Sequence, residues 1–155
     1  MTEKPIALVT GGAQGIGFAC AEAIAADGAQ IVLADVNDRG VKAAAENLAG
    51  DTVAYVCDMG EPDQIEALFG QIESDLGNIS ILVNNAGIAL PTDFLEVSCA
   101  DFQKVLNINL TGSFLATQRA AKSMIASGIE GAIVNMSSVN AQVAIPSIAA
   151  YCASK

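Results

Sequence analysis

Hydrophobic and polar positions divide the chain into two kinds of segment. Short apolar runs alternate with longer segments in which apolar residues recur at helical spacing, and several of these end at a glycine. The apolar runs predict strands over 5–10, 30–34, 52–57, 79–83 and 131–136. The segments between them predict helices over 15–27, 38–48, 61–76 and 98–127, and a further helix that begins near Ala149.

Strands that alternate with long helices are typical of a parallel, doubly wound α/β sheet. We therefore expect one domain over residues 1–155, because no linker or repeat interrupts the pattern. Several polar or glycine-rich positions follow predicted strands directly: the loop at Gly11, Asp35, Asp58, 84–87 and 137–138. Ligands in such sheets bind at the carboxyl ends of the strands, so this clustering predicts a binding site there.

Composition narrows the classes of function. Hydrophobic residues make up 52% of the chain and charged residues 15%, which suits a sheet buried on both faces. The formal net charge of −10 disfavours nucleic acid and anionic membranes as partners. The chain has no histidine, which excludes a Ser-His-Asp nucleophile and a histidine-ligated metal, and we expect no metal site. The four scattered cysteines are typical of reduced thiols in a cytoplasmic protein.

The loop from Thr10 to Gly17 joins the first predicted strand to the first predicted helix. Glycines there permit a sharp turn and a close approach of a ligand, and a helix N-terminus attracts an anion such as a pyrophosphate. The spacing differs from the common G-x-G-x-x-G fingerprint, and an ordinary glycine turn is the alternative.

Two carboxylates follow the next two predicted strands. Asp35 is placed to accept hydrogen bonds from the ribose hydroxyls of NAD and to repel the 2′-phosphate of NADP, although Arg39 lies nearby in sequence. A solvated loop aspartate is the alternative. Asp58 is placed either to contact the adenine amino group or to cap the third helix.

A tyrosine and a lysine lie four residues apart at Tyr151 and Lys155, which puts both on one face of a helix. A neighbouring ammonium favours phenolate over phenol and makes a phenol a usable base, although such a pair is more often a solvated helix face. Ser138, or the competing Ser137, follows the fifth strand and can hold a substrate oxygen. Asn109 lies inside the long fourth helix, where an amide can bend the helix and hold a water.

Together these motifs resemble the classical short-chain dehydrogenase/reductase family: Thr10-Gly11-x-x-x-Gly15-x-Gly17, Asn84-Asn85-Ala86-Gly87, Asn109, Ser138 and Tyr151-x-x-x-Lys155. The resemblance implies a Rossmann fold and an oxidoreductase that moves hydride between a nicotinamide and an alcohol or carbonyl. It implies that Tyr151 is the acid/base, that Lys155 activates it and binds ribose, that Ser138 orients the substrate and that Asn109 holds a relay water. The cofactor-binding residues that we expect are Gly11, Gln14, Gly15, Ile16, Gly17, Asp35, Asp58, Asn85, Ala86, Gly87, Tyr151 and Lys155.

Asp35 favours NAD over NADP as the cofactor, and the partner is then a small alcohol or carbonyl compound. The alternatives are an NAD-binding fragment with incomplete catalysis and a 3-oxoacyl-carrier reductase-like enzyme. Members of the family are longer and commonly form homotetramers or dimers. We therefore expect this chain to be part of a longer protein and to lack the C-terminal strands and helices of the fold.

Overall fold

The computed structural model describes residues 4–48 and 50–155. Five parallel strands form one sheet: β1 (Ile6–Thr10), β2 (Gln30–Asp35), β3 (Thr52–Val56), β4 (Ile81–Asn84) and β5 (Ala132–Asn135). Their order is β3-β2-β1-β4-β5, so the direction of winding reverses between β1 and β4. This is the doubly wound arrangement that the alternation of strands and helices predicted.

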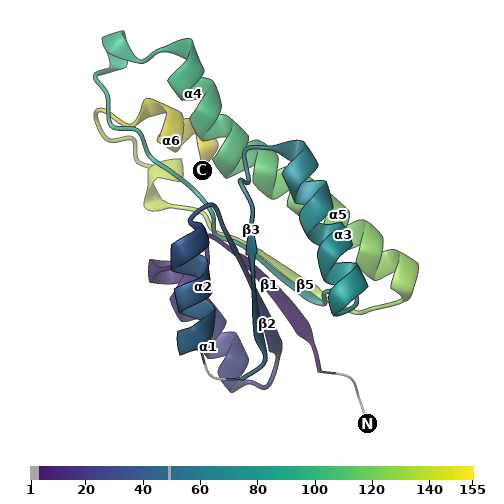
Figure 1. Cartoon of the computed structure of the whole chain (residues 1–155). Helices are drawn as coiled ribbons and strands as arrows, with labels where there is room; N and C mark the ends of the chain where they lie inside the picture. Colours follow the sequence, from purple (N-terminus) through teal and green to yellow (C-terminus); the bar gives the residue numbers. More distant parts are fainter. Residues whose placement is uncertain (1–3, 49) are drawn as a thin grey trace.

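Helices cover both faces of the sheet (Figure 1). Along β1, Ala7 and Val9 pack with α1 (Gly15–Ala26) and α2 (Asp38–Asn47), whereas Ile6 and Leu8 pack with α3 (Pro62–Asp75) and α5 (Ser113–Ser127). A buried parallel strand supplies both hydrophobic clusters because successive side chains point to opposite faces. None of the helices in the described residues is both long and apolar enough to cross a membrane.

The long helix predicted over 98–127 is interrupted. It consists of α4 (Cys99–Leu106), a π-helical segment (Asn107–Gly112) and α5. Ser98 caps α4, and its Oγ accepts a hydrogen bond from the Asp101 backbone N–H at 3.0 Å. Gly112 packs so closely against the Met59 carbonyl that a Cβ there would overlap it. The hydrogen bonds of a π-helix span one residue more than those of an α-helix, and the helical spacing of apolar residues in the sequence did not predict this change.

Two smaller features complete the chain. The loop after β4 contains a 3-10 turn over Phe94–Glu96, and another follows β5 over Val139–Ala141. The last helix, α6 (Ala149–Ser154), lies beside α4 beyond the carboxyl ends of the strands (Figure 1). One end of the molecule is therefore built from the carboxyl ends of the strands, α4 and α6.

An ion-pair cluster joins α3 to α5 on one face of the sheet. Arg119 donates to both carboxylate oxygens of Glu73, at 2.8 and 2.7 Å, and to Glu66 at 3.0 Å. The hydrogen bond from Arg119 is the main cause that lowers the pKa of Glu73. The buried Ser123 hydroxyl donates to the same Glu73 carboxylate at 2.8 Å and lies 2.7 Å from the Asn78 side chain. This cluster is remote from the carboxyl ends of the strands, and it holds α3 against α5.

Candidate active site

A cavity of about 690 Å³ lies at the carboxyl ends of the strands, at the point where the winding reverses. It brings together residues from four separate strand-to-helix connections. Of the cofactor residues that the sequence predicted, nine line it: Gly11, Gln14, Gly15, Ile16, Asp35, Asp58, Asn85, Ala86 and Gly87.

The glycine loop presents backbone N–H groups to this cavity. Gly11 and Gly15 have φ values of +65° and +60°, in the left-handed region that favours glycine. The N-cap of α1, Gln14, makes no side-chain hydrogen bond to the helix, and the first turn carries no acidic residue. The N–H groups of the first turn therefore have no intrahelical partner and are available to an anion.

Gly17 is buried and does not line the cavity, in contrast to Gly11 and Gly15. A Cβ at Gly17 would overlap the Gly11 carbonyl oxygen and lie 2.5 Å from Asn85 Nδ2. Gly17, which the sequence predicted to bind the cofactor, therefore acts on the cavity indirectly. It allows α1 to approach the loop closely enough for Gly11 and Gly15 to reach the cavity.

Thr10 and Asn85 join the loops that follow β1 and β4. Asn85 Nδ2 donates to the carbonyl oxygens of Thr10 and Gly11, both at 3.0 Å. The Thr10 hydroxyl accepts from the backbone N–H groups of Asn85 and Ala86, both at 3.1 Å. These four bonds hold two walls of the cavity together. Only the position of Thr10 at a strand end indicated this role in the sequence.

Asp35 ends β2 and lies half-buried in the cavity wall. Its Oδ2 accepts from the Ala13 backbone N–H at 3.1 Å, and its Oδ1 accepts from the Asn37 N–H at 2.9 Å. The carboxylate is thus held by amides of the glycine loop and of its own turn. Each oxygen keeps a further lone pair that can accept a hydroxyl proton.

Asp58 lines the same cavity from the turn after β3. Its Oδ1 accepts from the Gly60 N–H at 2.8 Å, and the N-cap residue of α3 is Glu61. Of the two predicted roles, helix capping is therefore wrong. The neighbouring Cys57 is buried, and burial, with the Asp58 charge as a second cause, raises the pKa of its thiol to about 11. Cys57 therefore contributes a neutral wall to the cavity.

Of the predicted catalytic pair, Tyr151 lies in α6 and Lys155 follows the last residue of that helix. Lys155 Nζ is 5.7 Å from the centre of the Tyr151 ring and donates to the Met136 carbonyl oxygen at 2.9 Å. The same amine would lie 3.5 Å from a Cβ on Gly87, so it reaches the loop that lines the cavity. Within residues 4–48 and 50–155, the Tyr151 hydroxyl makes no hydrogen bond and is available to a ligand.

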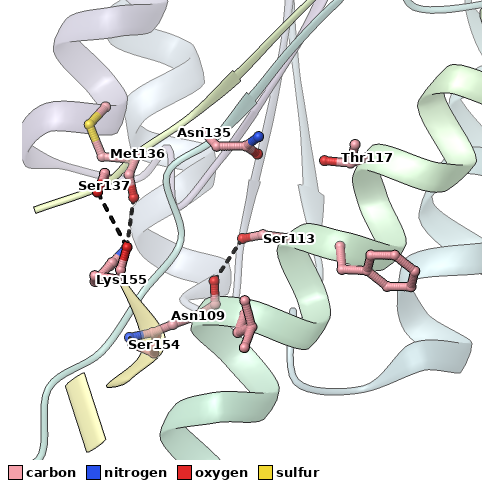
Figure 2. A pocket seen from close by; sticks show the side chains of 10 residues that line it. Asn109, Ser113, Thr117, Asn135, Met136, Ser137, Ser154 and Lys155 are labelled. Atoms are coloured by element: carbon pink, nitrogen blue, oxygen red, sulfur yellow. Dashed lines mark hydrogen bonds between the residues drawn. The ribbon is translucent and has the colours of Figure 1, made fainter. Parts of the chain in front are cut away.

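A second cavity, of about 330 Å³, lies between β5 and the helices (Figure 2). The residues that line it include Lys155, Ser137, Asn109 and Ser154. The Ser137 hydroxyl donates to the Lys155 carbonyl oxygen at 3.4 Å. Asn109, Ser154 and Lys155 line this second cavity, whereas no residue of 149–155 lines the first, so the predicted cofactor residues Tyr151 and Lys155 lie outside the first cavity.

Asn109 is buried in the π-helical segment, where its side chain is fully engaged. Its Oδ1 accepts from the Ile88 N–H at 2.8 Å, and its Nδ2 donates to the Ile88 carbonyl oxygen at 2.9 Å and to Ser154 Oγ at 2.8 Å. Its own carbonyl oxygen accepts from Ser113 Oγ at 2.9 Å (Figure 2). π-Helical turns of this kind are common at functional sites.

Ser138 lies after β5, and its hydroxyl caps a local turn. Its Oγ accepts from the Asn140 N–H at 3.1 Å and lies 3.2 Å from Asn140 Oδ1. The structure does not give it a hydrogen bond to Tyr151 within the described residues. Its predicted contact with a substrate oxygen stays a prediction.

Sequence reasoning did not single out several residues that line the first cavity. They come from the turns after β2 and β3 and from the helices that follow β4: Val36, Cys57, Met59, Lys104 and Ile108. Their places relative to the strand ends were the available signal. In the described part of the chain, no three metal-binding side chains lie together.

Comparison with known proteins gives consistent results. The family model for short chain dehydrogenases matches residues 5–155. D-threitol dehydrogenase of Mycolicibacterium smegmatis is 44% identical over 97% of this chain and 58% of its own length. NAD-dependent glycerol dehydrogenase of Listeria innocua is 38% identical over 100% of this chain and 60% of its own length.

The fold is similar to that of a solved reductase. A solved structure described as "Crystal structure of a putative betaketoacyl-ACP reductase" superposes with a TM-score of 0.90 at 33% identity, over 100% of this chain and 63% of the other. The chain thus spans about three fifths of the length of the proteins it matches. The matched family model covers the sheet, the glycine loop and α6 alike, and the chain belongs to the short chain dehydrogenase family.

Proposed function

We propose that this chain forms the cofactor-binding and catalytic part of an NAD-dependent oxidoreductase that moves hydride between nicotinamide and an alcohol or carbonyl compound. One observation carries the proposal. The glycine loop, Asp35, Asp58 and the loop 85–87 line one cavity, and Lys155, directly after α6, reaches Gly87 at its wall.

The residues of this cavity fit a dinucleotide. The uncapped first turn of α1 offers backbone donors for a pyrophosphate, and Gly15 places no side chain in the open space in front of that turn. The volume of about 690 Å³ is within the range of cavities that hold a cofactor. When bound, a nicotinamide would supply the hydride acceptor or donor.

NAD is the expected cofactor because of Asp35. Its carboxylate can accept hydrogen bonds from ribose hydroxyls, and its charge would repel a 2′-phosphate. Two backbone amides hold the carboxylate in the cavity wall, at 3.1 and 2.9 Å, so it cannot easily turn away. One similar protein, the glycerol dehydrogenase of Listeria innocua, is named as NAD-dependent.

Residues of α6 and of the segments next to it carry out the proton transfer to and from the substrate oxygen. The Tyr151 hydroxyl exchanges a proton with the substrate oxygen, and the Lys155 ammonium lies 5.7 Å from the centre of the Tyr151 ring. Ser138 donates to the substrate oxygen, and Asn109 fixes the loop at Ile88 and supports a relay water. We further propose that the complete protein is cytoplasmic and a homotetramer or dimer.

Small polyols are the first substrates to test, because two similar proteins are named for threitol and glycerol. A 3-oxoacyl thioester is the second candidate, because of the reductase with the similar structure. A third possibility is that this chain alone binds NAD without turnover.

The experiment compares these substrates with NAD and NADP, on this chain and on the longest natural form of the protein. We expect turnover of a polyol with NAD in the longer form, and Tyr151→Phe should lower kcat by about 10²-fold or more. Tyr55→Phe is the matched control, because Tyr55 donates to Asp75 at 2.8 Å on the far edge of the sheet. Asp35→Ala should increase turnover with NADP relative to NAD. NADP preference in the unmodified protein would contradict the role of Asp35, and full activity of Tyr151→Phe would refute the mechanism.

A further inference from the structure

Ser154 is a buried polar residue directly before Lys155, and it has a place in the site that its family motif does not assign. Its side chain is 6% exposed. Its Oγ accepts from Asn109 Nδ2 at 2.8 Å and donates to the Tyr151 carbonyl oxygen at 2.8 Å. One hydroxyl therefore joins the π-helical segment to the backbone of the proposed acid/base residue.

Asn109 extends this connection to the cofactor cavity. Both of its side-chain N–H groups are used, one for the Ile88 carbonyl oxygen and one for Ser154. Its Oδ1 holds the Ile88 N–H at 2.8 Å. Because Asn109 is 4% exposed, loss of the Ser154 hydroxyl would leave one of its buried N–H groups without a partner.

The two ends of this connection meet at one point of the cavity wall. A Cβ built on Gly87 would lie 3.3 Å from Asn109 Oδ1 and 3.5 Å from Lys155 Nζ. A shift of α6 against the π-helical segment would therefore change the distance between Lys155 and the cofactor loop. The other polar bonds between α6 and the strand ends, from Lys155 Nζ to Met136 and from Ser137 to the Lys155 carbonyl, both involve Lys155 itself.

We infer that Ser154 is a positioning residue that sets α6 against the cofactor loop through Asn109, and so places the Tyr151 hydroxyl and the Lys155 amine. This inference rests on the proposed function. A general packing role would depend on the volume of the Ser154 side chain. The role inferred here depends instead on two hydrogen bonds of its hydroxyl, with Asn109 and with the Tyr151 carbonyl oxygen. A small misplacement of catalytic groups lowers a rate far more than it changes cofactor affinity.

Ser154→Ala in the longest natural form of the protein tests this inference. We expect kcat to fall about tenfold or more, which is a larger change than the rise in KM for NAD that a displaced Lys155 would cause. The pH at which kcat reaches half of its maximum should move upward. Ser154→Thr keeps a hydroxyl that can bond the preceding turn and should retain most of kcat. Ser154→Cys preserves volume with weaker hydrogen bonds and provides a second measurement if the alanine variant is unstable.

Ser123→Ala is the matched control for loss of a buried serine hydroxyl. Ser123 is 7% exposed and has two polar neighbours, but it lies in the ion-pair cluster between α3 and α5. It should lower the melting temperature and leave kcat and its pH profile unaffected. If Ser154→Ala behaves in the same way as Ser123→Ala, the inference is wrong.

A readout without turnover separates this inference from the proposed function. Hydrogen exchange at the Ile88 amide should be several-fold faster in Ser154→Ala, because Asn109 would lose one of the bonds that hold its side chain. Unaltered exchange at Ile88 would overturn the inference even if no substrate is found. Absence of turnover in the unmodified protein, with faster exchange at Ile88 in the variant, would instead reject the proposed function alone.

Discussion

Replacement of Gly17 by alanine is the sharpest test of how the glycine loop is built. The new Cβ would overlap the Gly11 carbonyl oxygen and lie 2.5 Å from Asn85 Nδ2. Neither neighbour can move freely, because Asn85 Nδ2 donates to Thr10 and Gly11 at 3.0 Å each. The variant should therefore lose both packing and hydrogen bonds in the wall of the cavity.

The expected cost follows from three contributions. Overpacking a close contact costs about 1–3 kcal/mol. Each of the two disturbed hydrogen bonds contributes about 0.5–1.5 kcal/mol. The better helix propensity of alanine returns about 1 kcal/mol. We expect a net loss of about 1–5 kcal/mol, which lowers the melting temperature of a chain of this size by about 3–15 °C.

Gly70→Ala is the matched control in another helix. Gly70 lies exposed within α3, has no atom within 4 Å of a Cβ built on it, and has no positive φ. The same substitution there should stabilise the protein by about 0.5–1 kcal/mol. Urea unfolding followed by circular dichroism measures both, since the chain has no tryptophan for fluorescence. Equal stability of the two variants would refute the close approach of α1 to the loop.

Two further predictions concern ionisable groups outside the proposed chemistry. Arg119 lowers the pKa of Glu73 from its ordinary value of 4.5, so this pair stabilises the fold above that pH and the stabilisation is lost as pH falls through the lower folded value. Arg119→Met should lower the free energy of unfolding by about 1–2 kcal/mol at neutral pH. Urea unfolding of this variant should also depend less on pH below 4.5 than unfolding of the unmodified protein, and an equal dependence would contradict the prediction. Burial, with Asp58 as a second cause, raises the pKa of Cys57 to about 11, so iodoacetamide at neutral pH should label the exposed Cys99 well before Cys57, as peptide mass spectrometry can measure. Equal labelling in the folded protein would contradict this.

The sequence alone determined the order of elements and the end of the sheet that carries the site. Apolar runs and glycine stops located all five strands to within about two residues, since these signals are local to each segment. Polar residues directly after strands located the cavity, because parallel strands bring their carboxyl ends to one edge. Gly11, Asp35 and the loop 85–87 could therefore be grouped without coordinates.

Only the tertiary structure decided how these parts contact one another. The π-helical segment at Asn107–Gly112, the packing role of Gly17 and the Asn109–Ser154 bond all depend on residues far apart in the chain. Local periodicity carries no information about a carbonyl group that approaches from another loop, as Gly11 does at Gly17 and Met59 does at Gly112. These positions were settled by packing of whole elements, which a pattern of hydrophobic and polar residues does not encode.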